Sequence, residues 1–209
     1  MNVKVFPLGE LQANCYLLEK DSHSLLIDPG DSADFLAETI VSKGYTLDGM
    51  IATHGHFDHV MAAGELQMNF LVPLHIHEAD NFLLDRIQST AKHFLSASPA
   101  ILPITKKKSI HEGAVTIGIF SVRIMETPGH TPGSISIYIP KEGIVFSGDT
   151  LFYHAVGAWN HQYSRKELVR QSVKKILTLP EGTRILPGHG EETTVDEEKK
   201  NHTVEAFFS

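Results

Sequence analysis

Four side chains of the kinds that bind metal ions lie within six residues of one another. They are His54, His56, Asp58 and His59. Alternate residues of an extended strand point to the same face, so His54 and His56 can share one metal ion. Gly55 gives the backbone room to turn, which brings Asp58 and His59 towards a neighbouring point. Borderline metals such as zinc prefer imidazole and carboxylate ligands. The segment therefore predicts a metal site, with a histidine-rich surface loop as the alternative.

Three later segments each place one more metal ligand after an apolar run. Each has glycine beside the polar residue, which is typical of a strand that ends in a functional loop. The ligands are His130 in Thr-Pro-Gly-His-Thr-Pro-Gly, Asp149 in Ser-Gly-Asp-Thr and His189 in Pro-Gly-His-Gly. One such turn carries little information by itself. All three, together with residues 53–59, indicate a single site.

Short strands and helices must position these loops. Apolar runs bounded by glycine and proline predict strands at residues 3–8, 15–18, 24–27, 50–52, 115–119, 120–126, 134–139, 144–146 and 184–186. Helical spacing of apolar residues predicts helices at 35–41, 60–70, 78–87 and 167–177, and in the tail from 194. Residues 92–109 contain two prolines and a lysine run, and predict a long surface loop. Strands followed by helices, twice over, predict an α/β (α+β) fold with two sheets and helices outside them.

The chain resembles the metallo-β-lactamase superfamily, and in particular its single-domain glyoxalase II-like members. The resemblance covers nearly the whole chain. It rests on the order and spacing of Asn-Cys-Tyr-Leu at 14–17, Ile-Asp-Pro-Gly at 27–30, His-x-His-x-Asp-His at 54–59, Pro-Gly-His-Thr-Pro-Gly at 128–133, Ser-Gly-Asp-Thr-Leu-Phe at 147–152 and Pro-Gly-His-Gly at 187–190. It implies a four-layer αββα sandwich, a single domain over residues 1–209, and a site at one edge of the sheets.

The resemblance also implies a role for each predicted ligand. His54, His56 and His130 would bind one metal ion, Asp58, His59 and His189 a second, and Asp149 would bridge both. Zinc is the first expectation, although histidine and aspartate also accept iron or manganese. The implied reaction is hydrolysis of a thioester or ester-like bond by a metal-bridging hydroxide, since bound metal lowers the pKa of water to about 7. Asp58 is also a candidate proton acceptor.

The segment after Asp149 departs from the family pattern. Glyoxalase II enzymes place lysine or arginine in this segment, where the present chain has Ala158. The carboxylates of a glutathione thioester favour a cation, so this departure puts S-lactoylglutathione in doubt as a substrate. Tyr153, Trp159 and Asn160 are candidate substrate contacts that could shape a different pocket, and structural packing is an equal alternative for Trp159.

Composition limits the classes of function. The chain has 209 residues, 42% hydrophobic and 21% charged, which is typical of a globular protein. A net charge of −7 argues against binding to nucleic acid or to an anionic membrane. No apolar run reaches the length of a membrane span, and no signal peptide is recognisable, so we expect a cytoplasmic protein. We expect a small-molecule substrate, and the sequence leaves the oligomeric state open.

The sequence leaves other functions open. A persulfide dioxygenase would share the fold but bind one iron through two histidines and one aspartate. A nuclease, a β-lactamase and a metal-binding module without activity are further alternatives. The remaining histidines are expected on the surface or at strand ends. They are His23, His75, His77, His93, His111, His154, His161 and His202.

Overall fold

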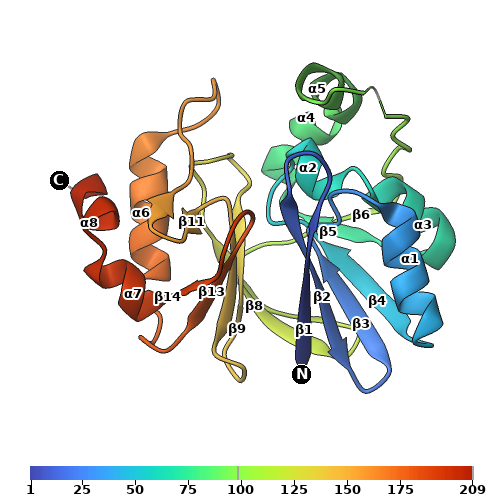
Figure 1. Ribbon diagram of the computed structural model, residues 1–209, viewed down its shortest axis with the longest axis horizontal. Coiled ribbons are helices and arrows are strands. Elements are labelled where there is room, and N and C mark those ends of the chain that lie inside the picture. Colours follow the sequence, from blue (N-terminus) through green and yellow to red (C-terminus); the bar gives the residue numbers. More distant parts are fainter. Residues whose placement is uncertain (98, 209) are drawn as a thin grey trace.

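A computed structural model describes residues 1–97 and 99–208. Two six-stranded sheets pack face to face, and helices cover the outer face of each sheet (Figure 1). This four-layer arrangement confirms the αββα fold predicted from the sequence. The flanking helices are α1 (Ala33–Ser42) and α3 (Ala63–Phe70) on one side and α6 (Lys166–Ile176), α7 (Val195–Lys200) and α8 (His202–Phe207) on the other. None of the helices in these residues is long and apolar enough to span a membrane.

The first sheet contains its strands in sequence order, antiparallel from β1 to β3 and parallel from β3 to β6. They are β1 (Asn2–Leu8), β2 (Ala13–Lys20), β3 (His23–Ile27), β4 (Thr46–Ile51), β5 (Leu74–Ile76) and β6 (Lys107–Ser109). Leu17 and Leu26 pack with residues of α1 and α3, whereas Leu18 and Leu25 pack against the second sheet. Because successive side chains point to opposite faces, a strand covered on both sides needs an unbroken apolar run.

The second sheet has the order β14-β13-β10-β9-β8-β7, with β10 and β13 parallel and the other neighbours antiparallel. Its strands are β7 (Gly113–Ile117), β8 (Phe120–Glu126), β9 (Ile135–Ile139), β10 (Ile144–Gly148), β13 (Arg184–Pro187) and β14 (Thr193–Thr194). Ile124 and Ile137 face the first sheet, and Val145 and Ile185 pack against α6. A small hairpin, β11 (Leu151–Phe152) and β12 (Ala155–Val156), follows β10.

Two predicted helices are interrupted in the structure. The helix predicted at 60–70 consists of α2 (Phe57–Val60) and α3, with a turn between them. The helix predicted at 78–87 consists of the 3-10 turn η1 (Glu78–Asp80), α4 (Asn81–Leu84) and the start of α5 (Ile87–Phe94). The loop predicted at 92–109 accordingly contains the last turn of α5 and the strand β6. The sequence did not predict β5 or β6, since three residues are too few to show an alternating pattern.

The amino-terminal hairpin joins the two sheets at the edge that carries the predicted ligands. An isolated bridge pairs Ala13 with His189. The Asn14 side-chain amide donates hydrogen bonds to the carbonyl oxygens of Pro187 and Gly190, at 3.0 and 2.9 Å. The Tyr16 hydroxyl also donates to the Pro187 carbonyl, at 2.6 Å. The loop that carries His189 is therefore held by residues from the start of the chain.

Candidate metal centre

The first ligand-bearing loop begins where β4 ends at Ile51. His54 and His56 lie in this loop, and Asp58 and His59 lie in the first turn of α2, which begins at Phe57. The Gly55 N–H donates to a carboxylate oxygen of Asp80 at 2.8 Å, and a Cβ at position 55 would lie only 3.0 Å from the Asp80 Cβ. The glycine in this motif thus permits a close approach between the loop and a buried carboxylate.

The other three ligand-bearing loops leave strands of the second sheet. His130 follows β8, Asp149 follows β10 and His189 follows β13. Because β10 and β13 are parallel neighbours, Asp149 and His189 emerge at the same end of the sheet. The structure therefore brings together all seven residues that the sequence predicted as ligands.

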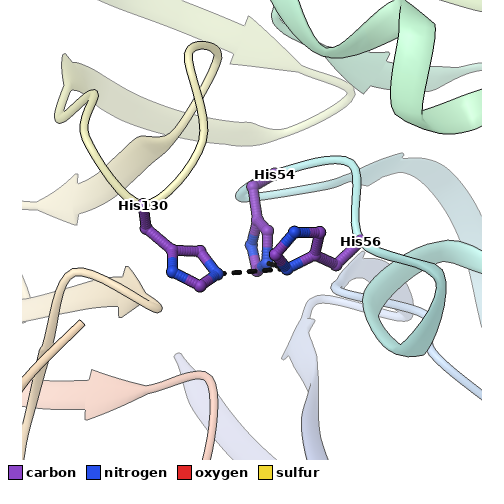
Figure 2. Close-up of side chains that lie close together, drawn as sticks. All are labelled: His54, His56 and His130. Atoms are coloured by element: carbon purple, nitrogen blue, oxygen red, sulfur yellow. Dashed lines mark hydrogen bonds between the residues drawn. The ribbon is translucent and has the colours of Figure 1, made fainter. Parts of the chain in front are cut away.

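One group of imidazoles converges on a common point (Figure 2). His54 Nε2 and His130 Nε2 each lie 3.0 Å from His56 Nδ1. One ring nitrogen from each of the three lies within 4.8 Å of the others. Ligands held 2.0–2.1 Å from a zinc ion in a tetrahedron are roughly 3.4 Å apart, so these spacings suit one ion.

A second group lies beside the first and combines two imidazoles with a carboxylate. His59 Nε2 and His189 Nε2 are 3.3 Å apart. Asp58 Oδ2 lies 3.3 Å from His189 Nε2 and 3.6 Å from His59 Nε2. These separations again match the distances between ligands of a single small ion.

Asp149 lies between the two groups. Its Oδ2 atom is 3.5 Å from His130 Nε2 and 3.8 Å from His189 Nε2, while Oδ1 is 3.5 Å from His59 Nε2. The Oδ1 atom is buried and has no hydrogen-bond partner among the residues that the structure describes. An unpaired buried carboxylate oxygen is costly. A cation at this position would satisfy it.

Each of the five histidines uses its outer ring nitrogen for a contact with the surrounding protein. This pattern is typical of metal-bound histidine, in which an outer partner fixes the ring orientation and the tautomer. The partners are the Thr53 hydroxyl for His54 (3.1 Å), the Tyr163 hydroxyl for His56 (2.6 Å), an Asp28 carboxylate oxygen for His59 (2.9 Å), the Ala158 carbonyl for His130 (2.9 Å) and the Leu11 carbonyl for His189 (3.1 Å). The inner nitrogens all face the centre, so the donor set fits a pair of metal ions.

Burial and charge set the protonation of the groups in this centre. Burial, reinforced by neighbouring imidazoles, holds the pKa of His54 and His56 well below the usual value for histidine. Burial also disfavours a charged His59, but the carboxylates of Asp58, Asp149 and Asp28 outweigh it and raise the pKa of His59 to about 10. His54 and His56 are therefore neutral at pH 7, which is the form that binds metal.

Three residues that support the centre were not predicted from the sequence. Asp28 accepts hydrogen bonds from the backbone N–H and the hydroxyl of Thr53, at 2.6 and 2.7 Å, besides its contact with His59. In the sequence it stood out only within the Ile-Asp-Pro-Gly motif at 27–30, with no role of its own. Asp80, hidden within a predicted helix, accepts from Gly133 N–H at 2.7 Å as well as from Gly55. Tyr163 lies in no recognisable motif, and only tertiary contacts reveal its position.

His161 lies closer to the centre than its sequence context indicated. Its ring centroid is 5.3 Å from that of His56 and 5.5 Å from that of His130. It also stacks on Tyr163, with the two ring planes 15° apart. The segment that carries His161 and Tyr163 thus borders the first group of ligands.

The predicted substrate contacts lie in different surroundings. Tyr153 is exposed and, with His189 and Glu191, lines an open pocket of about 340 Å³ beside the centre. Trp159 packs against Phe207, with ring centroids 5.0 Å apart, and the residue is 39% exposed. Asn160 is exposed. The structure therefore places Tyr153 beside a predicted ligand and places Trp159 against α8.

Comparisons with known proteins agree with this architecture. The sequence profile of the metallo-beta-lactamase superfamily matches residues 8–189. Hydroxyacylglutathione hydrolase GloC of Haemophilus influenzae is 32% identical over 207 residues, which cover 97% of each chain. The residues matched by the profile contain every predicted ligand position of this chain, and the similarity to GloC covers nearly all of the chain.

Two solved structures share the fold and a similar level of identity. The BLEG-1 B3 metallo-beta-lactamase has a TM-score of 0.87 and 32% identity, covering 97% of this chain and 99% of that one. TTHA1623 in a di-iron-bound form has the same TM-score and identity, covering 95% and 98%. On the profile match and these similarities, the chain belongs to the metallo-β-lactamase superfamily.

Proposed function

We propose that this chain is a dinuclear metal-dependent hydrolase that cleaves a thioester or ester-like bond in a small molecule. The observation that supports it best is Asp149, whose carboxylate lies near His130 of the first group and near His59 and His189 of the second. Its Oδ1 has no hydrogen-bond partner among residues 1–97 and 99–208. A carboxylate in this position suits a bridge between two ions. The set would use His54, His56 and His130 for one ion and Asp58, His59 and His189 for the other.

Two bound ions would supply hydroxide at neutral pH and polarise the carbonyl of the substrate. The protein's own residues hold the reacting groups in place. Asp28, Thr53 and Tyr163 keep the imidazoles in one orientation, so the donor atoms need little rearrangement. Burial alone would raise the pKa of Asp58, but His59 and His189 lower it below the usual range for aspartate. A weakly basic carboxylate favours the role of ligand for Asp58 over that of proton acceptor.

Zinc is the metal that we propose first, and iron is the alternative that the di-iron form of TTHA1623 supports. The name of the GloC relative supports a thioester as the substrate class. Position 158 is alanine, and its carbonyl is already used by His130. This side chain cannot pair with a glutathione carboxylate, so we propose a thioester whose acyl or thiol part carries less negative charge than glutathione.

Elemental analysis tests the metal content. Protein purified without chelator or added metal should hold about two metal ions per chain. His56→Ala and Asp149→Asn should hold fewer, and the exposed His93→Ala should match the parent protein. About one iron and no zinc in the parent chain would contradict the dinuclear hydrolase and favour a persulfide dioxygenase, for which oxygen uptake is the next assay.

A substrate panel tests the reaction. It should include S-lactoylglutathione, uncharged acyl thioesters, aryl esters and a β-lactam. We expect the uncharged thioesters to have the highest kcat/KM. Turnover of the β-lactam alone would contradict the proposed bond type, and a fully metal-loaded protein that cleaves no member of the panel would favour a binding module.

A further inference from the structure

A second set of metal-binding side chains lies outside the centre described above. We call His77, His111 and Glu126 the surface histidine cluster. His77 follows β5 and His111 follows β6, both in the first sheet, while Glu126 is the last residue of β8 in the second sheet. The three side chains are 17%, 53% and 40% exposed. The cluster therefore joins the two sheets at a solvent-accessible position.

The spacing of the donor atoms is that of a small cation site. His77 Nε2 lies 3.4 Å and His111 Nδ1 lies 3.8 Å from the same oxygen of Glu126. One atom from each residue lies within 4.8 Å of the others, and the two rings are 5.1 Å apart at an angle of 75°. Tetrahedral zinc ligands are roughly 3.4 Å apart, so small movements of these partly exposed side chains would complete the geometry.

A second observation concerns the orientation of His111. Its Nε2 atom lies 3.2 Å from a carboxylate oxygen of Glu78. If Nε2–H donates to Glu78, the lone pair of Nδ1 faces Glu126. A carboxylate on the outer nitrogen of a ligand histidine is the common supporting contact in metal sites. Glu78 thus supports His111 in the same way that Asp28 supports His59 in the main centre.

The competing interpretation is a network of ion pairs without metal. His77 Nδ1 accepts a hydrogen bond from the Ala79 N–H at 3.2 Å, so a neutral His77 carries its proton on Nε2, towards Glu126. Metal binding must displace this proton and weaken the Ala79 contact. The cluster should therefore bind more weakly than the buried centre and retain a metal only when free metal is supplied.

We propose that the surface histidine cluster is a third divalent-cation site, for zinc, nickel or copper, that links the two sheets. Imidazole nitrogen and one carboxylate favour these metals over magnesium and calcium, which prefer all-oxygen sites. Two ligands come from segments that follow strands of the first sheet and one comes from a strand of the second, so an ion bound here stabilises the contact between the sheets. The proposal does not depend on the hydrolase activity.

Zinc binding tests the proposal directly. Protein with its main centre filled is dialysed against buffered zinc from 1 to 100 µM, and bound zinc per chain is measured together with the melting temperature. The parent protein should take up one further zinc and melt at a higher temperature as it does so. His111→Ala and Glu126→Gln should lose both effects. The matched control is His202→Ala, because His202 is 98% exposed and 3.6 Å from Glu205, and it should behave as the parent.

A milder variant keeps the test valid if the ligand variants fold poorly. Glu78→Gln leaves all three metal-binding side chains in place and should weaken zinc binding about tenfold. This is the lower end of the roughly 10–100-fold loss expected when a residue that supports a metal ligand is replaced. Uptake by His111→Ala equal to that of the parent would overturn the proposal. An equal loss in His202→Ala would also overturn it, because uptake would then reflect scattered surface histidines.

Discussion

Gly188 packs closely against two side chains of the metal centre, and adding a single methyl group there should disrupt it. A Cβ at this buried position would lie 2.8 Å from His59 Cε1, and the Asp149 Oδ1 atom would be closer still. Ordinary contacts between such atoms are about 3.5 Å or more, so both side chains would have to move by roughly 1 Å. Metal ligands tolerate changes of only about 0.2 Å. Gly188→Ala should therefore displace one ligand of the second group and the bridging carboxylate together.

The expected magnitudes differ for folding and for metal binding. Overpacking of this kind costs about 1–3 kcal/mol of unfolding free energy, which urea titration of metal-free protein would measure. Zinc affinity should fall by at least about 100-fold, since lost supporting contacts alone cost about 10–100-fold. Competition with a chromophoric chelator would measure that loss.

Gly182→Ala is the matched control for this prediction. Gly182 is exposed, and a Cβ there would meet no atom within 4 Å. This variant should retain parental stability and zinc affinity. Equal zinc affinity of Gly188→Ala and Gly182→Ala would contradict the close packing described around Asp149 Oδ1.

The same zinc competition and urea titration test three further side chains. Asp80→Asn should leave a buried backbone N–H facing an amide donor, which should lower the unfolding free energy by about 1–3 kcal/mol and the zinc affinity at least tenfold. The exposed Asp85→Asn should change neither quantity, and equal stability of the two variants would contradict this prediction. Asp28→Asn should weaken zinc binding about 10–100-fold, and unchanged affinity would show that the contact with His59 does not orient the ligand. Tyr163→Phe should weaken zinc binding about tenfold without lowering stability, and a loss of stability alone would indicate a packing role.

The convergence of the candidate ligands could be predicted because its signal is local. His54, His56, Asp58 and His59 lie within one short segment, and His130, Asp149 and His189 each follow an apolar strand and a glycine. The order of strands and helices suggested two sheets with helices outside them, and the family resemblance implied the αββα sandwich. Side-chain type and sequence spacing carry this information directly.

The supporting residues could not be predicted in the same way. Asp80 contacts Thr131 and Gly133, more than fifty residues away, and Tyr163 contacts His56 across 107 residues. No local pattern records such pairs, because they form only when the two sheets pack. At the break between α2 and α3, the Ala62 N–H donates to the Pro29 carbonyl at 3.1 Å, which is another contact between segments distant in the sequence. Tertiary contacts thus determine the positions of supporting residues and the ends of helices, which the spacing of apolar residues does not predict.

The contact between the amino-terminal hairpin and the His189 loop has a consequence for biosynthesis. Asn14 and Pro187 are separated by 173 residues, and His59 and His189 by 130. A nascent chain is synthesised at about 5–20 residues per second, so roughly 6–26 seconds separate the synthesis of His59 from that of His189. During that interval the early ligands can bind metal only incompletely. Acquisition of a full metal complement would then report that synthesis has passed His189, because a chain truncated before that residue lacks one member of the second ligand group.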